Sequence, residues 1–305
     1  MSSKNSLIPN TLIVIAGPTA VGKTAVSINL AKKLGVEIIS ADSRQFYKET
    51  FIGTASPDEK EMQGVKHYFI GTLTIRDYYN VSKYKSDVST LLAELFKTYN
   101  KVIMTGGSGL YIDAVCEGID ELPDPDPILR QELNGLLKDK GITALQSRLK
   151  ELDPDFYATA DIMNSRRLIR AIEVCLLTGS TFSSLRMNKK TKHGYKIVKV
   201  GLNREKDDLR ERISRRTRKM FEEGFIEEAK ALLPYRHLNA LNTVGYKELF
   251  AYFDHYLTLE EALEKIETNT WRYAKRQLTW FKRDKDYRWF HADEEESILN
   301  YIIRQ

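Results

Sequence analysis

Short apolar runs alternate with segments of helical periodicity along most of the chain. β-rich runs that predict buried strands occupy residues 12–16, 36–40, 101–105 and 196–202. Between them, residues 25–34 and 81–99 place apolar side chains three or four positions apart, which predicts helices, and Gly35 suits the end of the first helix. Alternation of this kind is typical of a parallel sheet with helices on both faces. The expected fold class is therefore α/β, a parallel sheet flanked by helices.

The pattern changes between about residues 116 and 195. A proline-rich connector, LPDPDP at 122–127, precedes helical segments at 128–137, 142–152 and 166–177, with a short helix starting at Asp153-Pro154. No strand pattern is found there. We expect a smaller all-helical insertion domain, residues 116–195, carried on a catalytic core formed by residues 1–115 and 196–305.

The stretch GPTAVGKT, residues 17–24, has the spacing G-x-x-x-x-G-K-[ST] of a phosphate-binding loop. It lies between a predicted strand and a predicted helix, which is the context that the motif requires. The expected α/β fold is therefore a P-loop NTPase-like parallel sheet flanked by helices. Backbone amides and the helix N-terminus attract phosphate oxygens, Lys23 adds a positive charge, and Thr24 offers a hydroxyl to Mg²⁺. The loop predicts a bound di- or triphosphate without saying which, and a glycine-rich turn with a surface lysine is the alternative.

Asp42 follows the strand at 36–40, so the parallel sheet should place it in the same crevice as the loop. There it could hold Mg²⁺ through water or take a proton from a nucleophile, and helix capping is the structural alternative. The strand at 101–105 ends in Gly106-Gly107-Ser108, where ATPases and GTPases carry a Mg²⁺-binding aspartate. Ser108 suits hydrogen bonding to a phosphate or a base, although a turn that needs glycine at positive φ explains the same residues.

Composition narrows the class of protein further. Lys and Arg number 47 against 42 Asp and Glu, a formal charge of +5, and the excess is unevenly placed, which suggests an anionic partner on one face. Two distant cysteines without a C-x-x-C pair argue against a zinc site and suit a reducing compartment. No apolar run approaches the roughly 18 residues of a membrane span. We expect a cytoplasmic, soluble monomer that makes no membrane contact.

Basic residues gather in three helical segments. Arg166 and Arg170 share one helix face, the segment 207–224 carries an arginine-rich face that could close over the phosphate site, and 270–281 interleaves bases with aromatics. A solvated basic face explains the first segment equally well. An amphipathic core helix explains Trp280 in the last segment but not Lys275. His67 has no partner at metal-ligand spacing, so a structural hydrogen bond is expected.

Several of these segments together resemble the tRNA dimethylallyltransferases, the IPP transferase family, which prenylate the N6 amine of the adenine at position 37, beside the anticodon. The matching segments run in the family's order from about residue 11 to residue 290. They are GPTAVGKT (17–24), IISADSRQFYK (38–48), IGTASP (52–57), GGSGLY (106–111), RRLIRAIEV (166–174), TVGYKE (243–248) and AKRQLTWF (274–281).

The resemblance implies a role for each matching position. Asp42 takes the proton from adenine N6, Ser108 contacts the reacting end, and Arg216 contacts the diphosphate, while Thr24 helps to bind Mg²⁺. The diphosphate of dimethylallyl diphosphate is held by Gly17, Pro18, Thr19, Ala20, Val21, Gly22, Lys23 and Thr24. The residues expected to touch the tRNA anticodon stem-loop are Asp42, Ser43, Arg44, Gln45, Ser108, Arg130, Arg166, Arg167, Arg170, Asn242, Gly245, Tyr246, Lys247, Arg272, Lys275, Arg276 and Gln277.

Two positions depart from the family pattern, and three other functions compete with prenyl transfer to tRNA. Ser108 stands where threonine is usual, and Trp271 stands where an arginine is usual, so one phosphate contact is in doubt or exchanged for stacking. An adenylate isopentenyltransferase acting on free AMP or ATP would need neither the insertion nor the basic C-terminal helices. A small-molecule or nucleotide kinase would need the missing strand-end aspartate. A non-catalytic RNA-binding protein would not need intact Lys23, Thr24 and Asp42.

Overall fold

The computed structural model describes residues 10–187 and 191–305. The chain divides into two compact units, with one break after Cys116 and the other after Thr191. The first unit contains every strand of the described residues, and the second, residues 117–191, is helical. The helical unit corresponds to the segment for which the sequence predicted an insertion.

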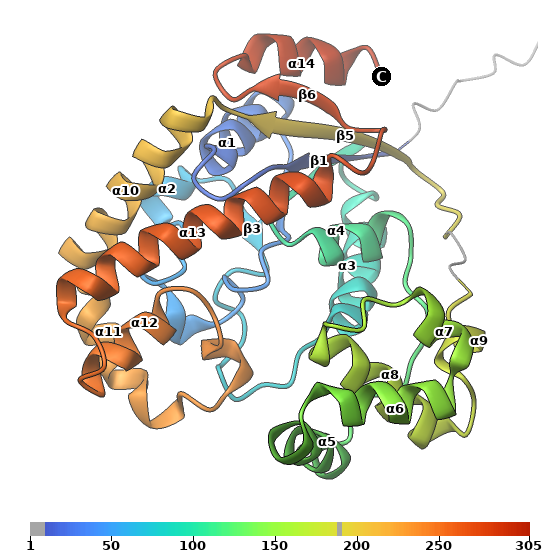
Figure 1. Ribbon diagram of the computed structural model, residues 1–305. Coiled ribbons are helices and arrows are strands. Elements are labelled where there is room, and N and C mark those ends of the chain that lie inside the picture. Colours follow the sequence, from blue (N-terminus) through green and yellow to red (C-terminus); the bar gives the residue numbers. More distant parts are fainter. Residues whose placement is uncertain (1–9, 188–190) are drawn as a thin grey trace, which may run out of the picture. The chain divides into compact units, whose positions relative to one another are not determined.

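A six-stranded sheet forms the centre of the first unit, in the order β3-β2-β4-β1-β5-β6, with every neighbouring pair parallel (Figure 1). The strands are β1 (Thr11–Ala16), β2 (Ile38–Ser40), β3 (His67–Tyr68), β4 (Lys101–Gly106), β5 (Lys196–Asn203) and β6 (Arg288–His291). The helices are α1 (Lys23–Leu34), α2 (Glu59–Met62), α3 (Val81–Leu95), α4 (Gly109–Cys116), α10 (Lys206–Glu222), α11 (Phe225–Leu232), α12 (Tyr246–Phe253), α13 (Leu259–Phe281) and α14 (Glu295–Ile303). Short 3₁₀ turns lie at Lys48–Thr50, Leu233–Tyr235 and Asn239–Leu241.

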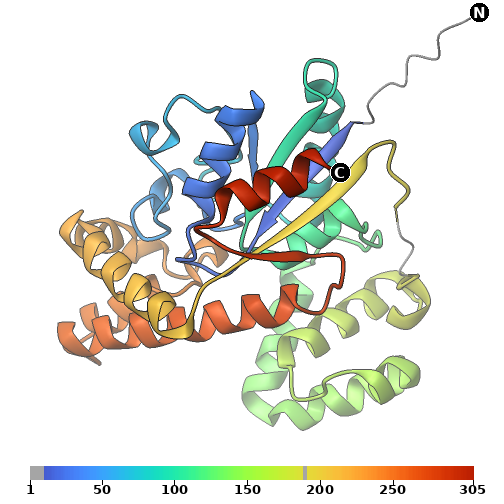
Figure 2. The same ribbon diagram turned by 90° about the horizontal axis from the view of Figure 1, so that it is seen from above.

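The alternating side chains of β1 explain why this strand is apolar throughout. Ile13 and Ile15 are fully buried in one cluster with residues of α1 and α14, while Leu12 and Val14 are fully buried in another with residues of α3. A strand covered on both faces has no solvent side to carry polar residues, so it is a continuous apolar run. Figure 2 shows α14 lying along one face of the strands. The predicted α/β class with a parallel, helix-flanked sheet is confirmed.

Several elements of the first unit were not predicted from the sequence, among them β3, β6 and α14. β3 contains only two residues, and β6, Arg288–His291, lies at the opposite edge of the sheet with one exposed and three half-buried side chains. Neither strand has the apolar run that marks a central strand. α14 is short, and α13 begins eleven residues before the segment singled out at 270, at an N-cap where Thr258 and Glu261 exchange hydrogen bonds with each other's backbone.

The helical unit contains α5 (Pro127–Lys140), α6 (Ile142–Leu152), α7 (Pro154–Thr159), α8 (Ser165–Thr178) and α9 (Phe182–Leu185). Its own apolar core includes Leu145, Leu149 and Leu168, all fully buried. Asp153 is also fully buried, and it accepts hydrogen bonds from the N–H groups of Phe156 and Ser183 at 2.9 and 2.7 Å. This carboxylate starts α7 and ties α9 to it, which explains an aspartate in the core.

No helix in the described part of the chain is long and apolar enough to cross a membrane.

Candidate active site

The strand order brings three turns to one edge of the sheet. β4 lies between β2 and β1, so the turns that follow these strands are neighbours. They carry Asp42 after β2, Ser108 after β4 and the phosphate-binding loop after β1. Ala41 N–H donates to Thr105 O at 2.7 Å, and Ser108 N–H donates to Ala41 O at 3.1 Å, which joins the first two turns directly.

A cavity of about 700 Å³ opens at this edge of the sheet. Loop residues Lys23 and Thr24 form part of its wall together with Asp42 and Arg216, so the expectation that the loop and Asp42 face one crevice is confirmed. Apolar side chains of Phe51, Ile52, Ile70 and Met220 complete the lining beside further polar groups. The cavity therefore combines a charged end with apolar walls.

The loop has the conformation of an anion site. Gly22 has φ +108°, in the left-handed region, and α1 begins at the next residue. The Lys23 ammonium turns back and donates to the carbonyl oxygens of Gly17 and Pro18 at 3.0 and 2.9 Å. Within the described residues, the N–H groups of Gly22, Lys23 and Thr24 have no hydrogen-bond acceptor. These amides and the ammonium are available to phosphate oxygens.

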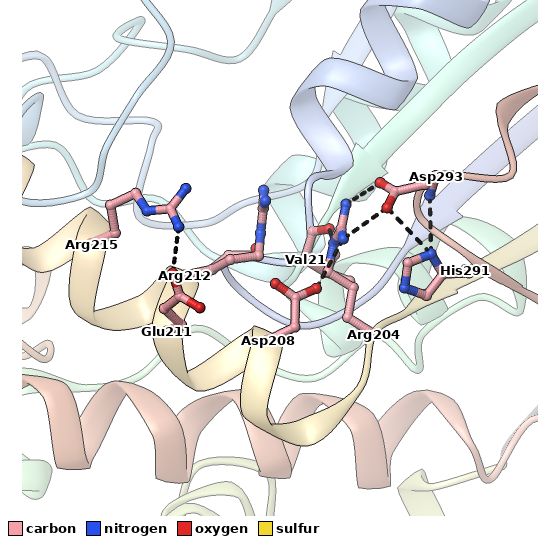
Figure 3. A network of polar contacts seen from close by, with 9 residues as sticks. Val21, Arg204, Asp208, Glu211, Arg212, Arg215, His291 and Asp293 are labelled. Atoms are coloured by element: carbon pink, nitrogen blue, oxygen red, sulfur yellow. Dashed lines mark hydrogen bonds and ion pairs between the residues drawn. The ribbon is translucent and has the colours of Figure 1, made fainter.

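Arginines of α10 and of the segment before it hold the outer side of the loop (Figure 3). Arg204 Nε donates to Val21 O at 2.8 Å, and Arg212 Nε donates to Ala20 O at the same distance. The predicted closing of an arginine-rich helix over the phosphate site thus has a structural basis. Arg204 and Arg212 were not among the predicted site residues. Arg212 lies four positions before Arg216, on the same helix face, and this spacing is the signal that would have found it. Arg204 lies 12 positions before Arg216, outside the helix.

Arg216 joins the loop to a second wall of the cavity. Its guanidinium donates to the Thr19 hydroxyl and, through Nη2, to Thr54 O at 2.8 Å. The segment around Thr54 is itself fixed by Glu228 of α11, whose carboxylate accepts the N–H groups of Ile52 and Gly53 at 2.7 and 2.8 Å. The sequence analysis gave no signal for Glu228.

Burial and neighbouring charges shift three titrating groups. Burial lowers the pKa of Lys23 to about 8, with Asp42 raising it and Arg216 lowering it by smaller amounts. Burial likewise lowers the pKa of Arg216 below its ordinary value, against a raising effect of Asp42. Burial raises the pKa of Tyr273 to about 12, and Asp42 adds to this. Burial thus disfavours the charged forms of Lys23 and Arg216 and keeps the Tyr273 phenol neutral.

Asp42 and Ser108 differ in how far they are engaged. Asp42 is half-buried, and its Oδ1 accepts the N–H of Arg44 at 3.2 Å within its own turn, so it caps no helix. The Ser108 hydroxyl accepts from Ser43 N–H at 2.9 Å and donates to the Ser43 hydroxyl at 3.1 Å. The Ser108 side chain also lowers the pKa of the Tyr273 phenol slightly, against the larger effect of burial. Ser108 is buried and its hydroxyl is engaged with Ser43, so its hydrogen bond to a phosphate or a base stays a prediction.

The expected reason for the glycines of the β4–α4 turn also needs correction. Neither Gly106 nor Gly107 has positive φ, so the predicted alternative of a left-handed turn is wrong. A Cβ on Gly106 would lie 2.2 Å from Ala41 O, and one on Gly107 would lie 2.2 Å from Gln277 Nε2. Glycine is required at these positions because neighbouring groups approach closely.

Three predicted RNA contacts, Gln277, Tyr246 and Gly245, are buried and have hydrogen-bond partners inside the protein. Gln277 is 5% exposed and bonds to the phosphate loop and to the β4–α4 turn. Tyr246 is fully buried, with its hydroxyl donating to Glu228 at 2.6 Å, and Gly245 beside it is buried as well. Their burial argues against direct contact with RNA for these three residues. The sequence could not show this, because spacing on a helix does not reveal which face is exposed to solvent.

Arg130 and Arg170 are likewise engaged within the helical unit. Both donate to the buried carboxylate of Glu173, at 2.5 and 2.8 Å, and Arg170 also donates to Pro123 O at 2.6 Å. Their first role is to neutralise Glu173, which is fully buried. Of the two arginines predicted to share one basic helix face, Arg170 is therefore engaged within the unit, and only Arg166 is exposed.

The predicted RNA-binding residues of the first unit fall into two groups. Arg44 donates to the carbonyl oxygens of Asn239 and Ala240, and Gln45 donates to Ala55 O, so both tie turns together. Ser43 and Asn242 are half-buried. The exposed cations are Lys247, Arg272, Lys275 and Arg276, with Arg166 and Arg167 exposed in the helical unit.

Trp271, where the family pattern has an arginine, is held by cations of this chain. The Arg210 guanidinium lies 4.8 Å and the Lys275 ammonium 5.8 Å from its ring centroid. His67 makes the expected structural bond, with Nδ1 2.8 Å from Val65 O, and it also lines the cavity.

The described residues contain no group of three or more His, Cys, Asp or Glu side chains that could hold a metal ion by themselves. Thr24 and Asp42 line the same cavity beside the loop amides. One or two protein oxygens with substrate phosphates are the usual donor set of Mg²⁺. These residues therefore fit a metal that binds together with a phosphate-bearing substrate.

A parallel α/β sheet with a phosphate-binding loop after its first strand, facing a carboxylate and an arginine-bearing helix across one cavity, defines an enzyme that acts on a phosphate-bearing substrate. Residues 45–284 match the family model described as IPP transferase, and the chain belongs to that family. The match covers all of α10 and α13 but begins after the phosphate loop and Asp42, so the loop supports the assignment independently.

Individual relatives match over nearly the whole chain. The tRNA dimethylallyltransferase 2 of Parabacteroides distasonis is 49% identical over 296 residues, which are 97% of this chain and 99% of that protein. The tRNA dimethylallyltransferase of Christiangramia forsetii is 49% identical over 294 residues, 96% of this chain and 97% of that protein. The structure of the full-length tRNA isopentenylpyrophosphate transferase from Bacillus halodurans superposes with a TM-score of 0.72 at 37% identity, covering 97% of this chain and 96% of that one.

The lowered pKa of Lys23 predicts a pH dependence of anion binding. The ammonium is present below pH 8 and is lost as the pH rises through about 8. Between pH 7 and pH 9 the affinity of the free protein for inorganic diphosphate should therefore fall about tenfold more in the wild type than in Lys23→Ala. Isothermal titration calorimetry at several pH values measures both, and Lys23→Ala corrects for titration of the ligand itself.

Lys33→Ala, an exposed lysine at the other end of α1 that pairs with Glu295, should keep the wild-type pH dependence. The same pH dependence in Lys23→Ala and the wild type would show that only the ligand titrates.

Proposed function

We propose that this chain transfers the dimethylallyl group of dimethylallyl diphosphate to the N6 amine of the adenine at position 37, adjacent to the anticodon, in tRNA. The observation that carries the proposal is the single cavity that the phosphate loop, Asp42 and Arg216 share. The names of relatives 49% identical over nearly the full chain support the choice of donor and acceptor.

The proposed reaction exchanges a C–O bond for a C–N bond and moves one proton. The adenine N6 lone pair attacks C1 of the dimethylallyl group, the C1–O bond breaks with its electrons going to the diphosphate, and the proton released from N6 goes to Asp42. Such a step needs an ionised carboxylate near the amine and a stabilised leaving group. Asp42 lines the cavity beside the loop, which supports its assignment as the base.

Cations and amides of the loop would stabilise the leaving diphosphate. Lys23, Arg216 and the N–H groups of Gly22, Lys23 and Thr24 converge on one end of the cavity. Negative charge grows on the diphosphate in the transition state, so these groups act most strongly there. Mg²⁺, which we propose to bind through Thr24 with the diphosphate, would supply further neutralisation.

The site has features that argue against the competing functions. β4 ends in Gly-Gly-Ser where an ATP-hydrolysing enzyme or kinase needs a metal-binding aspartate. A transferase that carries a group to an amine requires no activated water, so this carboxylate can be absent. Intact Lys23, Thr24 and Asp42 at one cavity would serve no purpose in a protein that only binds RNA.

Exposed cations support tRNA rather than a free nucleotide as the acceptor. Arg272, Lys275 and Arg276 are exposed on the last turns of α13, and Arg166 and Arg167 are exposed on α8. Phosphates of an anticodon stem-loop are suitable partners for such surfaces, and an unpaired adenine can leave its stack to reach Asp42. We also propose that the enzyme works as a monomer in the cytoplasm, where its tRNA substrate is found.

The proposal predicts transfer to tRNA and not to a free nucleotide. Labelled dimethylallyl diphosphate, Mg²⁺ and the enzyme are incubated either with unmodified tRNA or with AMP. Label should enter the tRNA, and digestion should recover it on the N6 of one adenosine next to the anticodon. Label in AMP at a comparable rate would favour the adenylate isopentenyltransferase.

Asp42→Asn should lower the turnover number about 10²–10⁴-fold, because the amide keeps the shape of the side chain but cannot accept the proton. Single-turnover transfer to tRNA measures the effect. Asp58→Asn is a matched control, since Asp58 lines the same cavity and caps α2, and asparagine caps a helix equally well. Turnover near the wild-type value in Asp42→Asn would exclude Asp42 as the base.

Replacing Lys275 and Arg276 together by alanine should reduce the salt dependence of tRNA binding. If each contacts one phosphate, the slope of log K against log salt should fall by about one to two units. Titration of one anticodon stem-loop at several salt concentrations measures the slope. A double variant of Lys83 and Lys97, exposed on α3 and just after it, serves as the control. Equal slopes in all three proteins would show that the α13 cations serve the fold and do not contact RNA phosphates.

A further inference from the structure

One face of α13 holds the β4–α4 turn. Tyr273, Gln277 and Trp280 are spaced at i, i+4 and i+7, and therefore lie on the same side of the helix. The Ser108 side chain acts on the phenol of Tyr273 and lowers its pKa, against the larger effect of burial. Gln277 Nε2 donates to Gly107 O at 2.8 Å, and Trp280 Nε1 donates to Asp113 Oδ2 at 2.9 Å.

Gln277 differs from its two neighbours because it also reaches the phosphate loop. Its Oε1 accepts the N–H of Thr19 at 2.8 Å. Both ends of the amide are thus used, in contacts with segments 258 and 170 residues away in sequence. The side chain is 5% exposed, and a Cβ on Gly107 would lie 2.2 Å from Nε2, so there is little room for it to move.

The two segments that Gln277 joins carry different parts of the proposed reaction. Thr19 belongs to the loop that would hold the diphosphate, and its hydroxyl bonds to Arg216. Gly107 precedes Ser108, whose hydroxyl bonds to the turn that contains Asp42 and Ser43. One buried amide therefore spans the donor side and the acceptor side of the cavity.

We propose that Gln277 is a positioning residue that sets the spacing between the phosphate loop and the β4–α4 turn, and hence between the leaving diphosphate and the base. The inference rests on the proposed function. Attack at carbon requires the reacting atoms to be held about 3–3.5 Å apart and in line, so a small change in spacing lowers the rate strongly. Gln277 touches neither substrate in this role, which replaces the RNA contact predicted from sequence.

Gln277→Met tests the role of the two hydrogen bonds. Methionine has nearly the same length and fills the same space, but it neither donates to Gly107 nor accepts from Thr19. We expect the turnover number for transfer to tRNA to fall about 10–100-fold. The KM for dimethylallyl diphosphate and the Kd for the stem-loop should change less than about threefold, since no substrate contact is removed.

Gln277→Glu separates the two ends of the amide. The carboxylate still accepts from Thr19 N–H, but it faces Gly107 O without a proton to donate. When it is protonated, the donor is restored. The turnover of Gln277→Glu relative to the wild type at the same pH should therefore rise as the pH falls, whereas that of Gln277→Met should stay constant. If Gln277→Met does not fold, the pH dependence of Gln277→Glu relative to the wild type still tests the role of the bond to Gly107.

Asn29→Leu is the control for a merely structural loss. Asn29 Nδ2 donates to Glu295 at 2.8 Å and so ties α1 to α14, away from both turns. Its loss should lower the melting temperature and leave the turnover number within about twofold of the wild type.

Three outcomes would overturn the inference. An unchanged turnover number in Gln277→Met with a lower melting temperature would make Gln277 structural only. A raised Kd for the stem-loop with unchanged turnover would restore the RNA contact. A pH-independent ratio in Gln277→Glu would show that the bond to Gly107 has no effect. A wild type that transfers nothing to tRNA would instead remove the proposed function itself.

Discussion

The orientation of the peptide groups in the phosphate loop is the constraint on which the site depends. A trans peptide directs its C=O and its N–H to opposite sides, so a group that holds the carbonyl also aims the amide. Arg204 holds Val21 O, which directs the next amide, that of Gly22, away from Arg204. The Lys23 ammonium holds the carbonyls of Gly17 and Pro18 from inside the loop. Loop carbonyls therefore have cationic partners within the chain, while the amides at the start of α1 are available to an anion.

Gathering these cations costs electrostatic free energy, and nearby carboxylates offset part of it. Arg204 is paired with Asp208 at 2.9 Å and with Asp293. Among the described residues, Asp42 is the one carboxylate that attracts both Lys23 and Arg216, and both cations have lowered pKa values. A loop whose cations are incompletely neutralised is stabilised by binding an anion.

The sequence predicted the central part of the fold because burial on two faces leaves a continuous apolar run. It predicted neither β3 nor β6, where two and four residues at the sheet edges have no such signal. The loop motif located one wall of the cavity, and strand-end logic placed Asp42 on another. Helix spacing from Arg216 could have marked Arg212 as a residue of the same face. The hydrogen bonds of Arg204 and Arg212 to loop carbonyls were not predictable, since they join residues more than 180 positions apart.

α13 shows why spacing alone could not separate structural residues from surface residues. The segment AKRQLTW, 274–280, contains two exposed cations next to a glutamine and a tryptophan whose polar atoms bond inward. In sequence they form one polar stretch of the kind that binds nucleic acid. On the helix, each residue is rotated about 100° from the last, so adjacent residues such as Arg276 and Gln277 point to different sides. One side can meet RNA phosphates while the other holds the turns around the cavity, and the second task requires a side chain that both donates and accepts. That requirement accounts for a buried glutamine among basic residues without any contact to RNA.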